Sequence, residues 1–157
     1  EGFVANSPAK NKSYVYNLYI SPRRNPLKDR YSQHIRGATD ISALNSAAQL
    51  FVGEHDFKAY CASRSQVKTT VRTVFSAYAE ERGEDVKITV CGGGFLYNMV
   101  RTMAGTMLGC ASGALSRDDI INSLATGSRN LVGKTMPARG LVLMDVDYGF
   151  DLFGEHL

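Results

Sequence analysis

Residues 85–101 are Asp-Val-Lys-Ile-Thr-Val-Cys-Gly-Gly-Gly-Phe-Leu-Tyr-Asn-Met-Val-Arg. The first seven alternate polar and apolar side chains, which is the period of a half-buried β-strand. Three glycines follow, and because they lack a Cβ atom the backbone there can turn sharply or approach another group closely. Apolar side chains then recur at helical spacing and form one stripe, made of Leu96, Met99, Val100, Met103 and Met107. The stretch predicts a strand, a glycine hinge and a helix.

A second face of this predicted helix carries Asn98, Arg101 and Gly105. The position of the arginine is unusual, because the first turn of a helix favours negative charge and disfavours a cation. A carboxylate or phosphate partner brought to this face would explain Arg101.

The chain before this stretch predicts a strand, a long loop and a helix. Residues 13–20 are rich in aromatic and β-branched side chains, which favour a strand. Residues 21–36 contain two prolines and five cations, and they predict a long basic loop that is either functional or a solvated connection. A helix is expected over 41–51, with Thr39 or Asp40 as its N-cap.

The remaining elements complete an α+β pattern. Two strands at 70–79 and 85–91 are joined by a short polar turn, which predicts a hairpin. Ser116 opens a further helix that closes at Gly127, and 141–148 forms a last strand. The order β-α-β-β-α-α-β predicts a mostly antiparallel sheet with helices packed on one face.

Composition fits one domain in a reducing compartment. The 157 residues are 44% hydrophobic, carry a net charge of +3 and contain no apolar stretch of membrane-spanning length. Cys61, Cys91 and Cys110 form no CxxC pair, and no histidine lies at metal-ligand spacing, so we expect reduced thiols, a cytoplasmic protein and no metal site. The chain begins Glu1-Gly2-Phe3 without an initiator methionine, and it is expected to be a piece of a longer protein.

Two other motifs have ordinary explanations. Gly133-Lys134-Thr135 resembles the end of a phosphate-binding loop, but Ser128 occupies the position where that loop needs its first glycine. His55 has no partner pattern and is expected in a turn.

Basic and aromatic side chains also interleave, which is compatible with RNA binding or with simple sheet packing. These residues are Lys10, Lys12, Tyr14, Tyr16, Tyr60, Arg64, Lys68 and Arg72.

Several segments in order resemble one family. Phe3-Val4-Ala5, followed by Ala9, Lys12, Tyr14 and Tyr16, is similar to the opening motif of the TruA-type tRNA pseudouridine synthases. The later motifs of that family resemble residues 53–57, Arg72, residues 95–101 and residues 137–143. The similarity extends from Phe3 to Tyr148. One departure is Asn6, where the family often has an arginine.

The resemblance implies an activity and a missing part. The family isomerises uridines 38–40 of the tRNA anticodon stem-loop to pseudouridine, as a homodimer and without a cofactor, using an aspartate in an Arg-Thr-Asp-x-Gly-Val-His motif. That motif lies in the N-terminal half of the family and is absent here, since Asp40 follows Thr39 but Ile41 comes next. Residues 1–157 therefore resemble the C-terminal domain alone, which we expect to be inactive by itself.

The resemblance also implies roles for individual residues. Arg101 aligns with the arginine that pairs with the catalytic aspartate, Tyr14 with the tyrosine that stacks on the target uracil, and Leu141 with an apolar residue of the pocket. The expected RNA contacts are Lys10, Lys12, Arg64, Arg72, Phe95 and Asn98. The alternative is a non-catalytic RNA-binding or assembly module that kept the fold, and the coding sequence upstream would distinguish the two.

Overall fold

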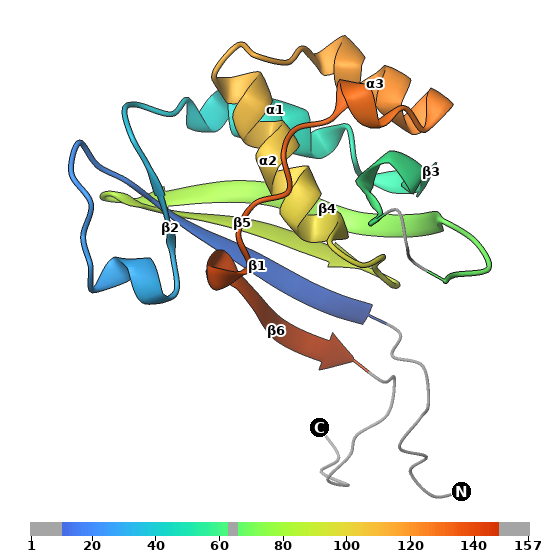
Figure 1. The fold of residues 1–157 in the computed structure, drawn as a ribbon. Helices are drawn as coiled ribbons and strands as arrows, with labels where there is room; N and C mark the ends of the chain where they lie inside the picture. The colour runs from blue at the N-terminus through green and yellow to red at the C-terminus, as the bar shows by residue number, and fades with distance from the viewer. Residues whose placement is uncertain (1–10, 63–65, 148–157) are drawn as a thin grey trace, which may run out of the picture.

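The computed structural model describes residues 11–62 and 66–147, which form one sheet with helices on one side (Figure 1). The described strands are β1 (Asn11–Ile20), β2 (Gln33–Ile35), β3 (Gly53–Asp56), β4 (Val71–Arg82), β5 (Asp85–Gly92) and β6 (Leu141–Asp147). The described helices are α1 (Ile41–Gln49), α2 (Met99–Ala111) and α3 (Arg117–Thr126), with 3-10 turns η1 (Lys28–Arg30), η2 (Lys58–Tyr60), η3 (Arg129–Leu131) and η4 (Ala138–Gly140).

The strand β1 organises the sheet, whose order is β2-β1-β5-β4-β3 with β6 also paired to β1. One edge of β1 pairs over residues 12–19 with the antiparallel β5. Its other edge is divided, because β6 pairs antiparallel with residues 11–16 and β2 pairs parallel with residues 18–20. All pairings except β1–β2 are antiparallel, which confirms the predicted α+β class.

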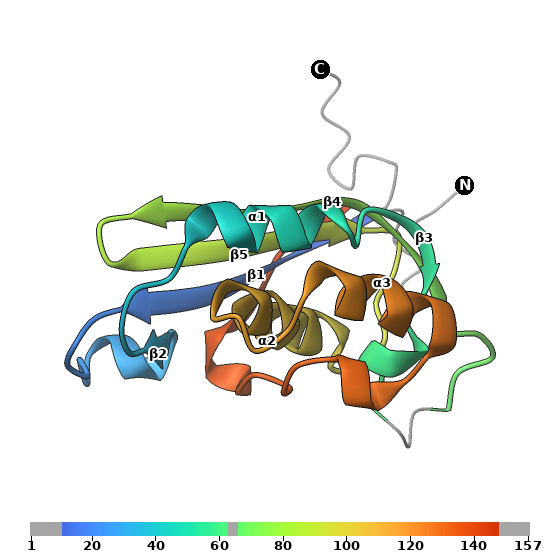
Figure 2. The ribbon, with the colours of Figure 1, turned by 90° about the horizontal axis from the view of Figure 1, so that it is seen from above.

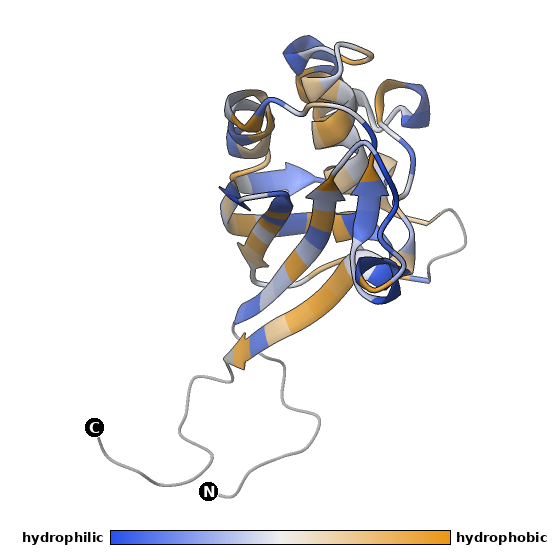
Figure 3. Ribbon diagram, turned by 90° about the vertical axis from the view of Figure 1, so that its left-hand side faces the viewer, coloured by the Kyte–Doolittle hydropathy of each residue, from blue (hydrophilic) through white to orange (hydrophobic). Residues whose placement is uncertain are grey.

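The core lies between the sheet and the helices, which cover one face of the sheet (Figure 2). The predicted stripe of α2 is buried over its whole length. Alternation along the strands places Tyr16 and Leu18 of β1, and Val86, Ile88 and Val90 of β5, against the helices. The bands of orange and blue along the strands in Figure 3 show the same alternation.

Two helix starts follow the predicted capping chemistry. The Asp40 carboxylate accepts hydrogen bonds from the backbone N–H groups of Ser42 and Ala43. Ser116 and Asp119 form a reciprocal capping box at α3, and Gly127 ends that helix in the left-handed conformation. Asp40 therefore has a structural role, as its sequence context indicated.

Three local predictions were wrong. The segment 21–36 is not only a loop, because it includes the strand β2. His55 lies in the strand β3 and not in a turn. The helix predicted from Leu96 begins at Met99. The hairpin is confirmed, but β4 continues to Arg82, so its turn is shorter than predicted.

A close crossing fixes the segment between α3 and β6 against α2. A Cβ atom on Gly105 would overlap the carbonyl oxygen of Lys134, and one on Gly133 would contact the Gly105 backbone. The Thr106 hydroxyl accepts a hydrogen bond of 2.9 Å from the Gly133 N–H. The Gly-Lys-Thr sequence therefore packs on a helix, and the crossing brings Met136 beside the first turn of α2.

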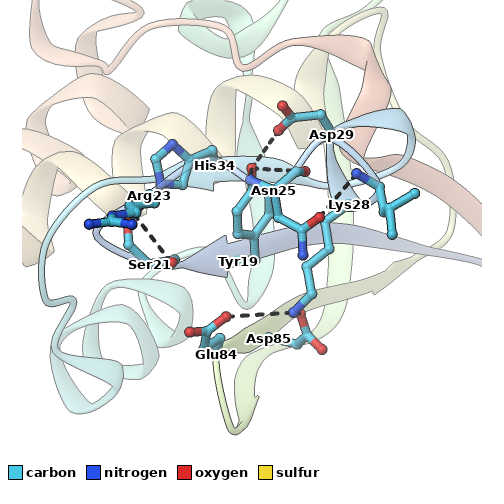
Figure 4. Close-up of polar contacts among 10 residues, drawn as sticks. Tyr19, Ser21, Arg23, Asn25, Lys28, Asp29, His34, Glu84 and Asp85 are labelled. Carbon is cyan, nitrogen blue, oxygen red and sulfur yellow. Dashed lines mark hydrogen bonds and ion pairs between the residues drawn. The ribbon is translucent and has the colours of Figure 1, made fainter.

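The basic segment between β1 and β2 is held by Tyr19 (Figure 4). The buried Tyr19 hydroxyl accepts from the Asn25 N–H at 3.0 Å and donates to the Asp29 carboxylate at 2.5 Å, and its ring stacks on His34. Burial and the Asp29 hydrogen bond raise the pKa of Tyr19, and the same hydrogen bond lowers the pKa of Asp29.

Two cations of that segment are used internally. Arg24 pairs with Asp29 at 3.1 Å. Lys28 pairs with Asp85 at 2.9 Å and with Glu84 at 3.8 Å (Figure 4). The two Lys28 pairs connect the segment to the β4–β5 hairpin, whereas the Arg24 pair lies within the segment. They leave fewer charges available for a partner than the sequence implies.

Within residues 11–62 and 66–147, no helix is both long and apolar enough to cross a membrane. The same residues contain no group of three or more His, Cys, Asp or Glu side chains that could hold a metal ion.

Candidate functional site

A hollow of about 410 Å³ lies where the chain enters α2, and we call it the Arg101 hollow. Its wall comes from three separate parts of the sequence: β1, the segment from the glycine hinge into α2, and the start of β6. The residues that matter for its chemistry are Tyr14, Phe95, Asn98, Arg101, Ala138 and Leu141. Its volume lies within the range of small-molecule sites.

The Arg101 side chain is held by two hydrogen bonds. Its Nε donates to the Met136 carbonyl oxygen at 2.6 Å, and Nη1 donates to the Asn98 Oδ1 at 2.8 Å. The backbone is fixed as well, because the Met136 N–H donates to the Arg101 carbonyl at 3.1 Å. A guanidinium has five N–H donors. One N–H on Nη1 and both on Nη2 therefore remain for a ligand.

Asn98 is in an unusual backbone conformation. Its φ of 64° and ψ of 6° place it in the left-handed region, and it is the single non-glycine residue of the described chain with a positive φ. Asparagine tolerates this region better than most residues. Its side chain does not cap α2, and its oxygen serves the Arg101 guanidinium instead. Such strain at a hollow is typical of functional sites.

The aromatic wall comes from β1 and the hinge. Tyr14 points to the same side of the sheet as Tyr16, two residues further along the strand. The Phe95 ring meets the Tyr14 ring edge-on, with centroids 5.1 Å apart and planes at 84°. Leu141 lies opposite Tyr16 in the β1–β6 register, so it faces the same side. Tyr14 and Leu141 remain half-buried, which leaves part of each exposed to the hollow.

Tyr16 fixes the chain segment that precedes Ala138. Its hydroxyl donates to the Pro137 carbonyl oxygen at 2.5 Å, which holds the chain between Met136 and Ala138 on β1. Burial raises the pKa of Tyr16 to about 12, against the opposing effect of the nearby Arg101 and Arg139. The phenol therefore stays a neutral donor at physiological pH.

The hollow is electropositive. Arg101 forms no ion pair within the described residues, where the ion pairs join Arg24 to Asp29 and Lys28 to Glu84 and Asp85. The N-terminal end of α2 adds a partial positive charge at the same place. A carboxylate entering the hollow would be favoured by both, and the outer end of the guanidinium could hold it with two hydrogen bonds.

The structure brings together five of the residues singled out in the sequence, namely Tyr14, Phe95, Asn98, Arg101 and Leu141. Lys12 lies in β1 and pairs with Gly92 and Val146, outside the wall of the hollow. Arg72 is turned back on its own loop, with Nη1 donating to the carbonyls of Thr69 and Val71. Lys10 and Arg64 lie outside the described residues.

Sequence reasoning missed the parts of the site that act through the backbone or by size. The Met136 carbonyl holds Arg101, and Ala138 leaves room beside it. Neither has a side chain whose type indicates this role. Tyr97, which is 68% exposed at the rim, carries an aromatic signal that a scan for interleaved aromatic and basic residues could have found.

The amino-acid sequence of the chain is similar to that of one protein family. A sequence model of the family described as tRNA pseudouridine synthase matches residues 47–149. The chain belongs to this family.

Individual relatives extend the similarity over nearly the whole chain. The tRNA pseudouridine synthase A of Geotalea uraniireducens is 45% identical over 146 residues, 93% of this chain and 60% of the relative. The proteins of the same name from Syntrophotalea carbinolica and Shouchella clausii are 45% and 40% identical, over 94% and 96% of this chain and 59% and 58% of the relatives. The chain thus spans about 60% of the length of the relatives it matches.

Proposed function

We propose that residues 1–157 are the C-terminal domain of a tRNA pseudouridine synthase, whose N-terminal domain carries the catalytic aspartate. The substrate is a uridine at positions 38–40 of the tRNA anticodon stem-loop, and the product is pseudouridine. No cofactor takes part. By family resemblance the full-length protein works as a homodimer in the cytoplasm, with tRNA as its partner.

One observation carries the proposal: an arginine with free N–H donors and no ion pair within the described residues shares one hollow with an aromatic face. Arg101 is already oriented by Met136 and Asn98, so a carboxylate from the other domain would meet a fixed guanidinium. Tyr14 lies in the same wall. A nucleophilic carboxylate and a surface that receives an unstacked base are the two requirements of this reaction.

The proposed mechanism divides the work between the two domains. The aspartate of the N-terminal domain attacks C1′ of the target uridine, and the glycosidic bond from C1′ to N1 breaks. The freed uracil rotates, its C5 displaces the aspartate from C1′, and C5 then loses its proton, so that the carboxylate is regenerated. Arg101 keeps that carboxylate ionised and directed at its target. Tyr14 receives the uracil ring on its face, and Leu141 completes the apolar side of the hollow.

Further residues are proposed to contact the RNA backbone or bases. Lys12, Arg72, Phe95 and Asn98 are the described members of this set, and Lys10 and Arg64 complete it. Phe95 and Asn98 are supported by their place in the wall of the Arg101 hollow. Arg72 can serve if RNA replaces the two backbone carbonyls that its Nη1 now contacts.

The 157-residue chain is expected to form no pseudouridine by itself, whereas the full-length protein should form it. The chain lacks the Arg-Thr-Asp-x-Gly-Val-His segment, and Asp40, Asp119 and Ser116 are occupied in helix caps. Both proteins are incubated with unmodified tRNA, and pseudouridine is counted by mass-tagging. Turnover by the chain alone would identify a different nucleophile. An inactive full-length protein that still binds tRNA would favour the non-catalytic RNA-binding module.

Tyr14 should tolerate phenylalanine but not leucine in the full-length protein. Phenylalanine keeps the ring face and its edge-on contact with Phe95, whereas leucine removes a stacking surface worth about 1–3 kcal/mol per base. The ratio kcat/KM on unmodified tRNA distinguishes the two variants. Equal losses in both would move the role to the hydroxyl, and no loss in either would leave Tyr14 with sheet packing alone.

A further inference from the structure

A second hollow of about 640 Å³ adjoins the first and has a different chemistry. Asn98 lines both hollows, so they meet at this residue. We call the second one the Arg129 hollow. Its wall comes from η2 and the residue after it, the approach to β4, the N-cap of α2 and the chain that follows α3. The residues that matter for its chemistry are Lys58, Cys61, Val67, Asn98, Arg129 and Thr135.

Arg129 is held in a fixed direction at this wall. Its Nη1 donates to the Ala59 carbonyl at 2.8 Å, and Nη2 donates to the Thr135 hydroxyl at 3.0 Å. The Thr135 hydroxyl shares a further hydrogen bond of 2.9 Å with Thr102 of α2. The guanidinium is therefore tied to two elements, and three of its five N–H groups remain available to a ligand.

The second cation of the hollow is Lys58. The aliphatic part of its side chain lies beside Gly127. A Cβ atom added to Gly127 would lie 3.2 Å from Lys58 Cδ. In the part of the chain that the structure describes, neither Lys58 nor Arg129 has an ion-pair partner. The nearby Asp56 carboxylate is engaged by the Thr70 hydroxyl and the Lys58 backbone N–H. Lys58 and Arg129 therefore bring two positive charges to one concave surface, against the single negative charge of the nearby Asp56, and the excess favours an anionic ligand.

Part of the wall is apolar, because Val67 and Cys61 contribute to it. A ligand that matches both features has a negatively charged group and a flat or apolar part. A nucleotide has both, and its phosphate accepts hydrogen bonds from guanidinium and ammonium groups. The continuity with the Arg101 hollow at Asn98 indicates a chain that passes from one hollow to the other.

We propose that the Arg129 hollow binds the nucleotide next in the RNA chain to the one in the Arg101 hollow, with its phosphate on Arg129 and Lys58. The inference rests on the proposed function for the identity of the RNA. The site is a positioning site: it holds the strand so that the neighbouring nucleotide enters the Arg101 hollow. It takes no part in the chemical step.

The test uses the full-length protein and an unmodified tRNA transcript. Arg129→Gln should weaken tRNA binding roughly tenfold, because a charge-assisted contact is lost. The slope of log affinity against log salt should fall by about 0.7–0.9. At saturating tRNA, kcat should remain within about twofold of the wild-type value, since the reacting groups are untouched. Arg129→Lys should keep most of the salt slope, because it keeps the charge.

Two further variants make the result decisive. Lys58→Gln should change affinity and slope in the same direction, and Lys58 makes no side-chain hydrogen bond in the described structure whose loss would threaten folding. Arg82→Gln, at the tip of the β4–β5 hairpin, removes the same charge elsewhere and should change neither quantity.

Three outcomes would overturn the inference. The first is that Arg129→Gln and Lys58→Gln both match Arg82→Gln in affinity and slope. The second is that Arg129→Gln lowers kcat with binding unchanged. The third is that it weakens binding of inorganic phosphate but not of tRNA, which would mean an anion site unrelated to RNA. If the wild-type protein binds tRNA but forms no pseudouridine, the proposed function fails while the binding measurements still decide this inference.

Discussion

Replacing Arg101 with lysine in the full-length protein should lower kcat for pseudouridine formation by about 100-fold or more. Lysine keeps the charge but loses the planar fork. Its single ammonium would have to serve Met136, Asn98 and an incoming carboxylate at once, so the carboxylate would be misplaced, and errors of about 1 Å can cost that factor. The measurement is single-turnover conversion of unmodified tRNA at saturating enzyme.

The matched control is Arg117→Lys, which makes the same change at the exposed start of α3. It should leave kcat unchanged. The thermal unfolding midpoint of the Arg101→Lys protein should stay close to that of the wild type, since an ion pair at an open hollow contributes little to stability. Wild-type turnover by Arg101→Lys would refute the carboxylate-clamp role.

The largest effect on stability is expected from Gly105→Ala. The added methyl group would overlap the Lys134 carbonyl, which is backbone and cannot move without shifting the whole crossing segment. Overpacking of this kind costs about 1–3 kcal/mol or more, which exceeds the gain of about 1 kcal/mol from replacing a helical glycine with alanine. Denaturant unfolding of the 157-residue chain measures the difference.

Gly94→Ala provides the comparison, because a methyl group there meets only the Arg72 side chain at 3.7 Å. Its unfolding midpoint should remain near wild type. In the full-length protein, Gly105→Ala should also reduce activity, since moving the crossing segment moves the Met136 carbonyl away from Arg101. Equal stability of Gly105→Ala and the wild type would show that the close crossing does not form.

Elements with strong local signals could be predicted from the sequence. The alternation of 85–91 and the capping residues Asp40 and Ser116 depend on side chains within a few positions, and the structure has them as expected. The short strands β2 and β3 could not be predicted. The three residues of β2 gain strand geometry from pairing with β1, and the four residues of β3 gain it from pairing with β4. In both cases a loop separates the two paired strands in the sequence.

The predicted start of α2 was wrong because the helical spacing of apolar residues begins before the helix does. Leu96 continues the apolar stripe, but Asn98 breaks the helical geometry with its left-handed conformation. The gathering of Tyr14, Arg101 and Leu141 was expected through family resemblance, because no pattern within the sequence connects residues so far apart. The Met136 carbonyl had no sequence signal at all, since every residue has one.

The conformation of Asn98 restricts which amino acid the position can accept. Among the residues that enter the left-handed region most readily, glycine would keep the backbone but give the Arg101 guanidinium no oxygen. Aspartate would supply the oxygen but also a negative charge, and it would neutralise the arginine from within its own domain. Asparagine alone among the three satisfies the backbone, holds Arg101 and leaves its charge for another carboxylate. The change Asn98→Asp conserves size, but its carboxylate would therefore compete with the incoming carboxylate for Arg101.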